Sequence, residues 1–359
     1  MKKDLKYKIS ALMFIAASLT VTSCEDWTEV ESLEINTPSF EEQNPQLYED
    51  YINDLKRYKS EEHKVTFVSF ENPKGVPSKQ AEHLTAIPDS VDFICLNNPA
   101  NVAVETQNEM EEIRKKGTRT VYMIDYKAIE SAWEDSIKAN PSLTEEAALS
   151  YIVTRTEEQI AYCDNFNFDG IVTDYFGHSL VSLNPEALSV YNARQQAFFG
   201  KIMDWKNSHE DKTLVFYGNV QYLVPENMTM LEKFDYIMLK TMLSSNGDDY
   251  ALKAYLALQA GEDATTELGT TVNPVPSDRF IICVELPQAD DKEQVKGYWN
   301  ILDENGEKIM AAKGAAEWMK RESVDFTRKG IFIMNVHSDY YNNTYENVRE
   351  IIHTMNPNN

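Results

Sequence analysis

The 359-residue sequence contains few cysteines, and they do not form a metal-binding or disulfide pattern. It has four cysteines, with neither a CxxC pair nor a cysteine–histidine spacing typical of a metal site. Three of them, Cys95, Cys163 and Cys283, lie within apolar runs, and an odd number favours buried thiols over a disulfide framework. We therefore predict no metal and no other cofactor.

Positive charge is also scarce. The sequence has 34 lysines and arginines against 58 aspartates and glutamates, a formal net charge of −24. Such a surface repels nucleic acid and anionic lipid, so we expect no nucleic-acid partner and no phosphate-binding role. An uncharged partner such as an oligosaccharide suits this composition better.

The N-terminus has no apolar stretch long enough for a secure membrane span. Basic residues near Met1 precede an apolar run from Ile9 to Val21, which is short for a bilayer and typical of a signal peptide. Small residues just before Cys24 resemble a lipobox, in which the cysteine is acylated and becomes the new N-terminus. We predict a signal peptide over 1–23 and an outer-membrane lipoprotein anchored through Cys24. An ordinary signal peptide with an incidental cysteine is the alternative.

Residues 24–39 are predicted to be an acidic tether. Glu25, Asp26, Glu29 and Glu31 resemble the export signals of Bacteroidetes surface lipoproteins, which implies exposure on the cell surface. A flexible acidic linker is the alternative. Removal of residues 1–23 takes away four lysines and one aspartate, so the mature charge becomes −27.

Residues 40–359 are predicted to be a single domain. A helix is expected from residue 40 to about 60, closing the lower end of a barrel. Eight short runs rich in β-branched and aromatic residues follow, at 64–70, 91–97, 118–126, 168–175, 213–218, 236–241, 280–286 and 330–336. Helical stretches are expected between them, at 107–116, 144–166, 185–207, 249–260 and 311–321.

This alternation of strands and helices favours an α/β fold, the (β/α)8 TIM barrel. No glycine-rich phosphate turn follows the first run, which argues against an open doubly wound sheet. In TIM barrels the working residues lie at the carboxyl ends of the strands. The predicted glycan-binding residues at these ends are Asn97, Asp125, Tyr126, Asp174, Tyr175, Phe176, Tyr217, Asn219, Lys240, Glu285, His337 and Tyr340.

Each of these residues also has a purely structural interpretation. Asp174 could simply pair with Lys240 in a buried position, an arrangement compatible with either kind of function. The tyrosines Tyr175, Tyr217 and Tyr340 are equally consistent with core or rim packing.

One segment, DGIVTDYF from Asp169 to Phe176, carries a family resemblance. It resembles the DGxDxDxE motif of the family 18 glycoside hydrolases, the chitinases and endo-β-N-acetylglucosaminidases. In that family the final glutamate protonates the leaving oxygen, and the carboxylate two residues earlier orients the acetamido group of the substrate. Here Asp169 and Gly170 match, Val172 replaces the first inner aspartate, Asp174 keeps the second, and Phe176 replaces the glutamate.

Two further segments depart from the family pattern. The sixth strand of the family commonly ends in Met-x-Tyr-Asp, whereas this chain has Lys240 and Thr241 at the last two positions. The eighth strand of chitinases carries a tryptophan, and residues 334–337 contain none. Because loss of general acid catalysis typically costs about a hundredfold to ten-thousandfold in rate, we predict no catalytic residue and an inactive relative of these enzymes.

These observations lead to three hypotheses about function. The first is a cell-surface protein that binds an N-glycan or another GlcNAc-containing oligosaccharide for uptake, beside an outer-membrane importer complex. The second is an active endo-β-N-acetylglucosaminidase with a relocated acid, Glu285 or Asp125, whose turnover would vanish in Glu285→Gln or Asp125→Asn. The third is a scaffold component of an uptake complex that binds membrane partners and no saccharide.

Overall fold

The computed structural model describes residues 40–357, so the predictions for the signal peptide, for Cys24 and for the tether lie outside the described residues. The chain divides into two units, 1–50 and 51–359. The described part of the first unit is helical: α2 (Phe40–Gln43) and the beginning of α3 (Pro45–Ser60). The helix predicted from residue 40 to 60 is interrupted at Asn44, since Pro45 has no amide hydrogen to donate and is favoured at the start of a new helix.

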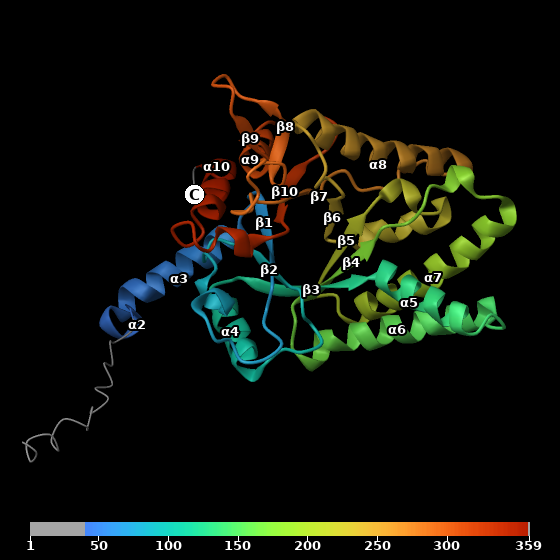
Figure 1. Ribbon diagram of the computed structural model, residues 1–359, viewed down its shortest axis with the longest axis horizontal. Helices are drawn as coiled ribbons and strands as arrows, with labels where there is room; N and C mark the ends of the chain where they lie inside the picture. The colour runs from blue at the N-terminus through green and yellow to red at the C-terminus, as the bar shows by residue number, and fades with distance from the viewer. Residues whose placement is uncertain (1–39, 358–359) are drawn as a thin grey trace, which may run out of the picture. The chain divides into compact units, whose positions relative to one another are not determined.

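Eight parallel strands of the second unit form a closed barrel (Figure 1), which confirms the predicted (β/α)8 fold. Around the barrel the order is β1-β10-β7-β6-β5-β4-β3-β2. Each of the eight predicted runs contains or overlaps one of these strands. Their bounds are β1 (Val65–Phe70), β2 (Phe93–Leu96), β3 (Arg119–Asp125), β4 (Gly170–Tyr175), β5 (Thr213–Gly218), β6 (Tyr236–Leu239), β7 (Phe280–Val284) and β10 (Arg328–Ile333).

Helices connect the strands, and several begin at a polar side chain that caps the first turn. Asp125, Thr144, Asn184 and Asn246 each accept hydrogen bonds from backbone amides at a helix start. The sequence interpretation missed two of these helices, α5 and α10. The bounds are α4 (Val104–Lys115), α5 (Tyr126–Ala139), α6 (Glu145–Asn165), α7 (Pro185–Ser208), α8 (Gly247–Leu268), α9 (Ala311–Met319) and α10 (Glu346–Met355).

Shorter elements occupy the loops. An antiparallel hairpin of β8 (Tyr298–Leu302) and β9 (Lys308–Met310) lies between β7 and α9 in the chain and was not predicted. Short 3-10 segments occur at η1 (Gln80–Glu82), η2 (Leu84–Ala86), η3 (Leu180–Ser182), η4 (Val220–Tyr222), η5 (Pro225–Lys233) and η6 (Val336–Asp339). None of the helices within residues 40–357 is long and apolar enough to cross a membrane.

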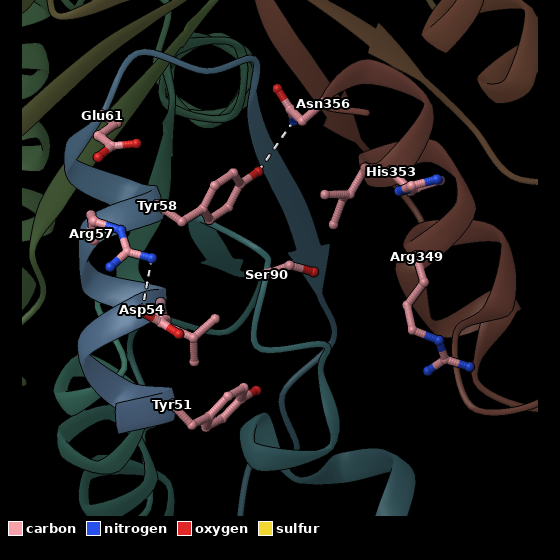
Figure 2. Close-up of a pocket in the computed structure, with 11 residues that line it drawn as sticks. Tyr51, Asp54, Arg57, Tyr58, Glu61, Ser90, Arg349, His353 and Asn356 are labelled. Carbon is pink, nitrogen blue, oxygen red and sulfur yellow. Dashed lines mark hydrogen bonds and ion pairs between the residues drawn. The ribbon is translucent and has the colours of Figure 1, made fainter. Parts of the chain in front are cut away.

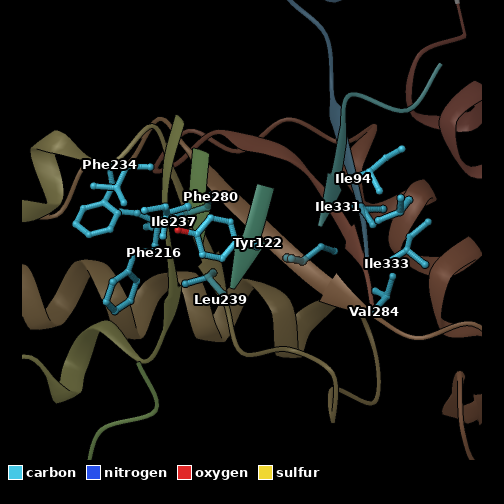
Figure 3. Close-up of a cluster of buried hydrophobic side chains, with 14 of the residues drawn as sticks. Ile94, Tyr122, Phe216, Phe234, Ile237, Leu239, Phe280, Val284, Ile331 and Ile333 are labelled. Atoms are coloured by element: carbon cyan, nitrogen blue, oxygen red, sulfur yellow. The ribbon is translucent and has the colours of Figure 1, made fainter. Parts of the chain in front are cut away.

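The strands separate two apolar clusters, because successive side chains point to opposite faces of a strand. Outward-facing residues such as Tyr122, Phe216 and Ile331 belong to the larger cluster between the strands and the helices (Figure 3). Inward-facing residues such as Phe67 and Val172 fill the barrel interior. The predicted buried thiols are confirmed, since each of the following is fully buried and free: Cys95, Cys163 and Cys283.

Candidate functional site at the barrel mouth

The carboxyl ends of the barrel strands carry a set of inward-facing polar side chains, here called the barrel mouth. The interior cluster includes Val172 on β4, Met238 on β6 and Cys283 on β7. The residue two positions further along each strand faces the same way. This alternation places six predicted site residues at the mouth: Asn97, Asp125, Asp174, Tyr217, Lys240 and Glu285.

An ion pair lies at the centre of the barrel mouth. The ammonium nitrogen of Lys240 lies 2.5 Å from Oδ1 of Asp174, and both side chains are 19% exposed. The same nitrogen lies 3.7 Å from the ring centroid of Tyr217 and 5.5 Å from that of Phe176. Lys240 is therefore held by a carboxylate and two aromatic faces, all of which attract a cation. The predicted pairing of Asp174 with Lys240 is confirmed.

The surroundings of this pair set its protonation. Burial raises the pKa of Asp174 above its ordinary value, Asp125 adds to the rise, and the charge and hydrogen bond of Lys240 oppose it. Burial also raises the pKa of Tyr217 far above its usual range, so its hydroxyl stays protonated. That hydroxyl donates a hydrogen bond to Sδ of Met242 at 3.6 Å.

Phe176 lies just beyond the end of β4. Its side chain is 53% exposed. The backbone is held there because Nδ2 of Asn219 donates a hydrogen bond to the carbonyl oxygen of Phe176 at 3.2 Å. The next residue, Gly177, has a φ of 65°, a left-handed conformation that favours glycine. The predicted site residues Asn219 and Phe176 are thus in contact, although through the backbone of Phe176.

Two other carboxylates face the barrel mouth. Asp125 is the register partner of Asp174 on the neighbouring strand, and its Oδ1 accepts a hydrogen bond from the amide of Ala128 at 3.1 Å. Asp125 therefore also serves as the N-cap of α5. Glu285, which follows β7, is half-buried, and within residues 40–357 its side chain has no hydrogen bond or ion pair.

Two of the predicted site residues lie away from the barrel mouth. Tyr126 and Tyr175 are 4% and 0% exposed, and their rings pack against each other with centroids 5.0 Å apart. Both contact Phe198 of α7, and the hydroxyl of Tyr175 accepts a hydrogen bond from Gln195 at 3.0 Å. The prediction that these two tyrosines line the site is wrong. Neighbouring strand positions face opposite sides of the barrel wall, so Tyr175 points outward from β4, and Tyr126 is the first residue of α5 and packs in the same outer cluster.

The last two predicted residues lie on the segment after β10. His337 is exposed on η6. Tyr340 is half-buried and packs against the outer core, with its ring centroid 5.6 Å from that of Tyr345. His337 is thus exposed to solvent after β10, whereas Tyr340 contributes its ring to packing in the outer core.

Cavities also occur away from the barrel mouth. A cavity of about 670 Å³ lies between α3 and α10, and Tyr58 and His353 are among the residues that line it (Figure 2). None of the predicted site residues lines this cavity. A second cavity, of about 440 Å³, lies beside the loop that follows β4 and is lined by Glu130, His178 and Tyr191 among others. Within residues 40–357 no group of three or more histidine, cysteine, aspartate or glutamate side chains is arranged to hold a metal ion.

Comparison with known families accounts for this architecture. The model of glycoside hydrolase family 18, BT1044-like, matches residues 28–354. This chain belongs to that family. A search of curated proteins found no significant match.

Solved structures similar to this chain include BT1044 and two chitinases. BT1044, in a selenomethionine form with a Glu-to-Gln substitution, is 16% identical, with 89% of this chain and 96% of that chain covered and a TM-score of 0.61. A family 18 chitinase from Pseudoalteromonas aurantia is 11% identical, with 81% and 99% covered and a TM-score of 0.48. A chitinase from Bacteroides thetaiotaomicron is 12% identical, with 82% and 97% covered and a TM-score of 0.43.

In this family 18 chain the opening Asp-Gly of the strand motif has a structural role at the end of the barrel away from the mouth. Oδ2 of Asp169 accepts a hydrogen bond from the amide of Thr120 at 2.8 Å. Arg114 pairs with the same carboxylate, with Nε 2.8 Å from Oδ1. A Cβ atom on Gly170 would lie 2.1 Å from the carbonyl oxygen of Thr213, so only glycine fits there.

The role of Asp169 is repeated twice around the barrel. Asp92 and Asp235 also precede a strand, and each accepts a hydrogen bond from a backbone amide of the neighbouring strand at 2.8 Å. All three occur in an Asp-x-Ile segment, at the starts of β2, β4 and β6. The aspartate that opens the family motif in this chain is thus one of three aspartates that precede a barrel strand and bind a backbone amide of the neighbouring strand.

Proposed function

We propose that this family 18 protein binds a GlcNAc-containing oligosaccharide, such as an N-glycan, at the barrel mouth and does not hydrolyse it. The observation that carries the proposal is the group of Asp174, Lys240 and Phe176. Asp174, the one inner carboxylate of the motif that this chain keeps, pairs with Lys240, and the phenyl ring of Phe176 lies on the same cation.

The proposed lack of hydrolysis rests on the chemistry of these three side chains. Family 18 catalysis requires a proton donor two residues after the orienting carboxylate, and Phe176 has no titratable proton. Val172, at the position of the other inner carboxylate, is fully buried among apolar side chains of the barrel interior. Lys240, which aligns with the family's tyrosine on strand six, forms an ion pair with Asp174 that competes with any substrate amide.

The proposed binding rests on groups that suit an uncharged sugar. The half-exposed ring of Phe176 offers an apolar face on which a pyranose can stack. Asn97 is exposed at the end of β2, where its amide oxygen accepts a hydrogen bond from the Ser69 hydroxyl at 2.9 Å and its amide nitrogen remains a donor. Aromatic faces combined with a few fixed polar groups are typical of small-ligand sites.

The cellular part of the proposal concerns anchoring and uptake. The lipobox-like segment ending at Cys24 and the acidic residues after it support a lipoprotein of the outer membrane, exposed at the cell surface. In that setting a non-hydrolysing receptor would hold glycans for neighbouring enzymes and an importer complex.

One specific observation favours a second candidate, hydrolysis with a relocated acid. Glu285 lies on an inward-facing strand position and has no described partner within residues 40–357. Asp125 is a weaker candidate, because its carboxylate already caps α5. The third possibility, a scaffold without saccharide affinity, is an outcome of the test below.

The test is a glycan array followed by isothermal titration on the chain from residue 25 onward. We expect saturable binding of a chitobiose-containing or N-linked glycan without product formation. Phe176→Ala should weaken it by about fivefold, since a sugar stacked on a ring contributes about 1 kcal/mol. Val181→Ala is the matched control, because Val181 is 98% exposed on the same loop and should leave affinity unchanged. Flat titrations with mannose-rich, complex and chitobiose glycans would refute the binding proposal.

A further inference from the structure

A positively charged cavity lies at the amino-terminal end of the barrel, opposite the barrel mouth. It has a volume of about 320 Å³ and is bordered by α3, by the start of β3 and by the residues that precede β4 and β5. The lining is rich in cations although the whole chain has a net charge of −24. Its charged side chains are five cations and two carboxylates: Lys56, Lys59, Arg114, Arg119, Lys212, Asp169 and Asp211.

One of the two carboxylates is already neutralised. Asp169 accepts hydrogen bonds from Nε and from an Nη nitrogen of Arg114, at 2.8 and 3.1 Å. Asp211 is exposed at the rim and has no ion pair within residues 40–357. Setting the Arg114–Asp169 pair aside leaves four cations against one carboxylate.

Three of these four cations have hydrogen-bond donors to spare. Lys56 is exposed and has no hydrogen bond or ion pair within the described part of the chain. Arg119 makes one long hydrogen bond, at 3.3 Å, to the hydroxyl of Thr213. Lys212 makes one, at 2.7 Å, to the carbonyl oxygen of Phe168. A guanidinium has five N–H donors and an ammonium three, so most of these donors remain open.

The fourth cation, Lys59, is the most buried. Its ammonium nitrogen donates to the carbonyl oxygen of Val91 at 2.8 Å and to the hydroxyl of Thr118 at 2.5 Å. Burial lowers the pKa of Lys59 to about 8; nearby carboxylates oppose this, while Lys116 and Arg119 add to it. The opposing carboxylates are Asp92 and Asp89. An anion in the cavity would favour the charged ammonium and raise this pKa.

We propose that this cavity, here called the basic cavity, binds the tetrahedral oxyanion of a phosphorylated or sulfated monosaccharide. Lysine and arginine donors converging from separate elements suit phosphate and sulfate. The volume lies at the lower end of small-molecule sites, about 300 to 1,000 Å³, which leaves room for one sugar ring beside the anion. The proposal rests on this local excess of cations and departs from the expectation, drawn from net charge alone, of no phosphate-binding role.

The experiment is titration with inorganic phosphate, N-acetylglucosamine 6-phosphate and N-acetylglucosamine 6-sulfate. We expect all three to bind, and Lys56→Glu to weaken binding by about fivefold, because reversing an exposed charge removes an attraction and adds a repulsion. Arg119→Gln is a second variant with the same expectation. Lys74→Glu, an equal charge change at an exposed lysine after β1, is the control and should change nothing.

A second measurement follows the Lys59 ammonium by NMR. Its pKa should rise when inorganic phosphate is added to wild type and rise less in Lys56→Glu. The proposal is overturned if no saturable oxyanion binding occurs, or if Lys56→Glu and Arg119→Gln bind as wild type does. Unmodified N-acetylglucosamine reports on the barrel mouth alone, so failure of one site is distinguishable from failure of the other. Binding only to phosphatidylglycerol vesicles, lost in Lys56→Glu, would place the anion on a lipid and overturn the monosaccharide ligand.

Discussion

Lys240 neutralises Asp174, with 2.5 Å between the ammonium nitrogen and the carboxylate oxygen at the centre of the barrel mouth. The two residues come from β4 and from the end of β6, and they are 66 positions apart in the chain. In the proposed function this pair limits both what the barrel mouth binds and which chemistry it supports. Its removal is therefore the first test.

Lys240→Met should destabilise the protein at pH 7 by about 2 kcal/mol, because it leaves the carboxylate of Asp174 largely buried without a cation. Burial already raises the pKa of Asp174, and loss of Lys240 raises it further. An acid whose pKa is raised in the folded state binds more protons there, so stability rises as pH falls. The deficit in urea unfolding should therefore be smaller at pH 4 than at pH 7.

The control for this measurement is Lys240→Arg, which keeps the charge and should retain most of the stability. The double variant Asp174→Asn with Lys240→Met should recover much of the loss, because no buried charge remains. Equal deficits at both pH values would contradict the assigned role of the pair.

Phe176→Glu alone should not produce measurable hydrolysis of a chitobiose-linked glycan. The introduced carboxylate would lie near the Lys240 ammonium, which is 5.5 Å from the ring centroid of Phe176. A nearby cation favours the ionised form and lowers the pKa, so the new group would be a poor proton donor at neutral pH. The triple variant with Val172→Asp and Lys240→Tyr is the comparison and should show more turnover. Robust hydrolysis by the single variant would mean that the other departures matter little.

Glu285→Gln and Asp125→Asn should leave product formation at the level of the uncatalysed reaction, as in wild type. Both carboxylates face the barrel mouth, so either could supply a proton if the chain were an enzyme. Glu293→Gln, an exposed carboxylate in the loop after β7, serves as control. Wild-type turnover of a chitobiose-linked glycan that disappears in one of the two variants would replace the receptor proposal with the relocated-acid enzyme.

Gly170→Ala should destabilise the fold by about 3 kcal/mol or more, because overpacking against backbone cannot relax easily. The added methyl carbon would lie 2.1 Å from the carbonyl oxygen of Thr213. Gly200→Ala is the matched control, since nothing lies within 4 Å of that Cβ position in the helix α7. It should stabilise the protein by about 0.5 to 1 kcal/mol. Urea midpoints that shift equally for the two variants would contradict the tight contact at the start of β4.

Much of the fold could be predicted because local patterns report burial directly. Each strand is a short apolar run covered on both faces, and such runs are readable without tertiary information. Helix α5 was missed because it begins at Tyr126, immediately after the last residue of β3, with no loop to mark the change. Strand alternation by itself puts Tyr175 on the face opposite to Asp174, so the outward position of this tyrosine is contained in the sequence.

The sequence by itself determined the eight strands and the presence of Asp174 and Phe176 at the end of the fourth one, because these depend only on residue type and periodicity. Only the tertiary structure decided that Asp169 joins strands, that Lys240 lies between Asp174 and Tyr217, and that cations gather at one end of an acidic protein. Closure of the barrel brings together residues that lie dozens of positions apart. Their charges interact over a few ångströms, and the order of residues along the chain does not reveal which of them come that close.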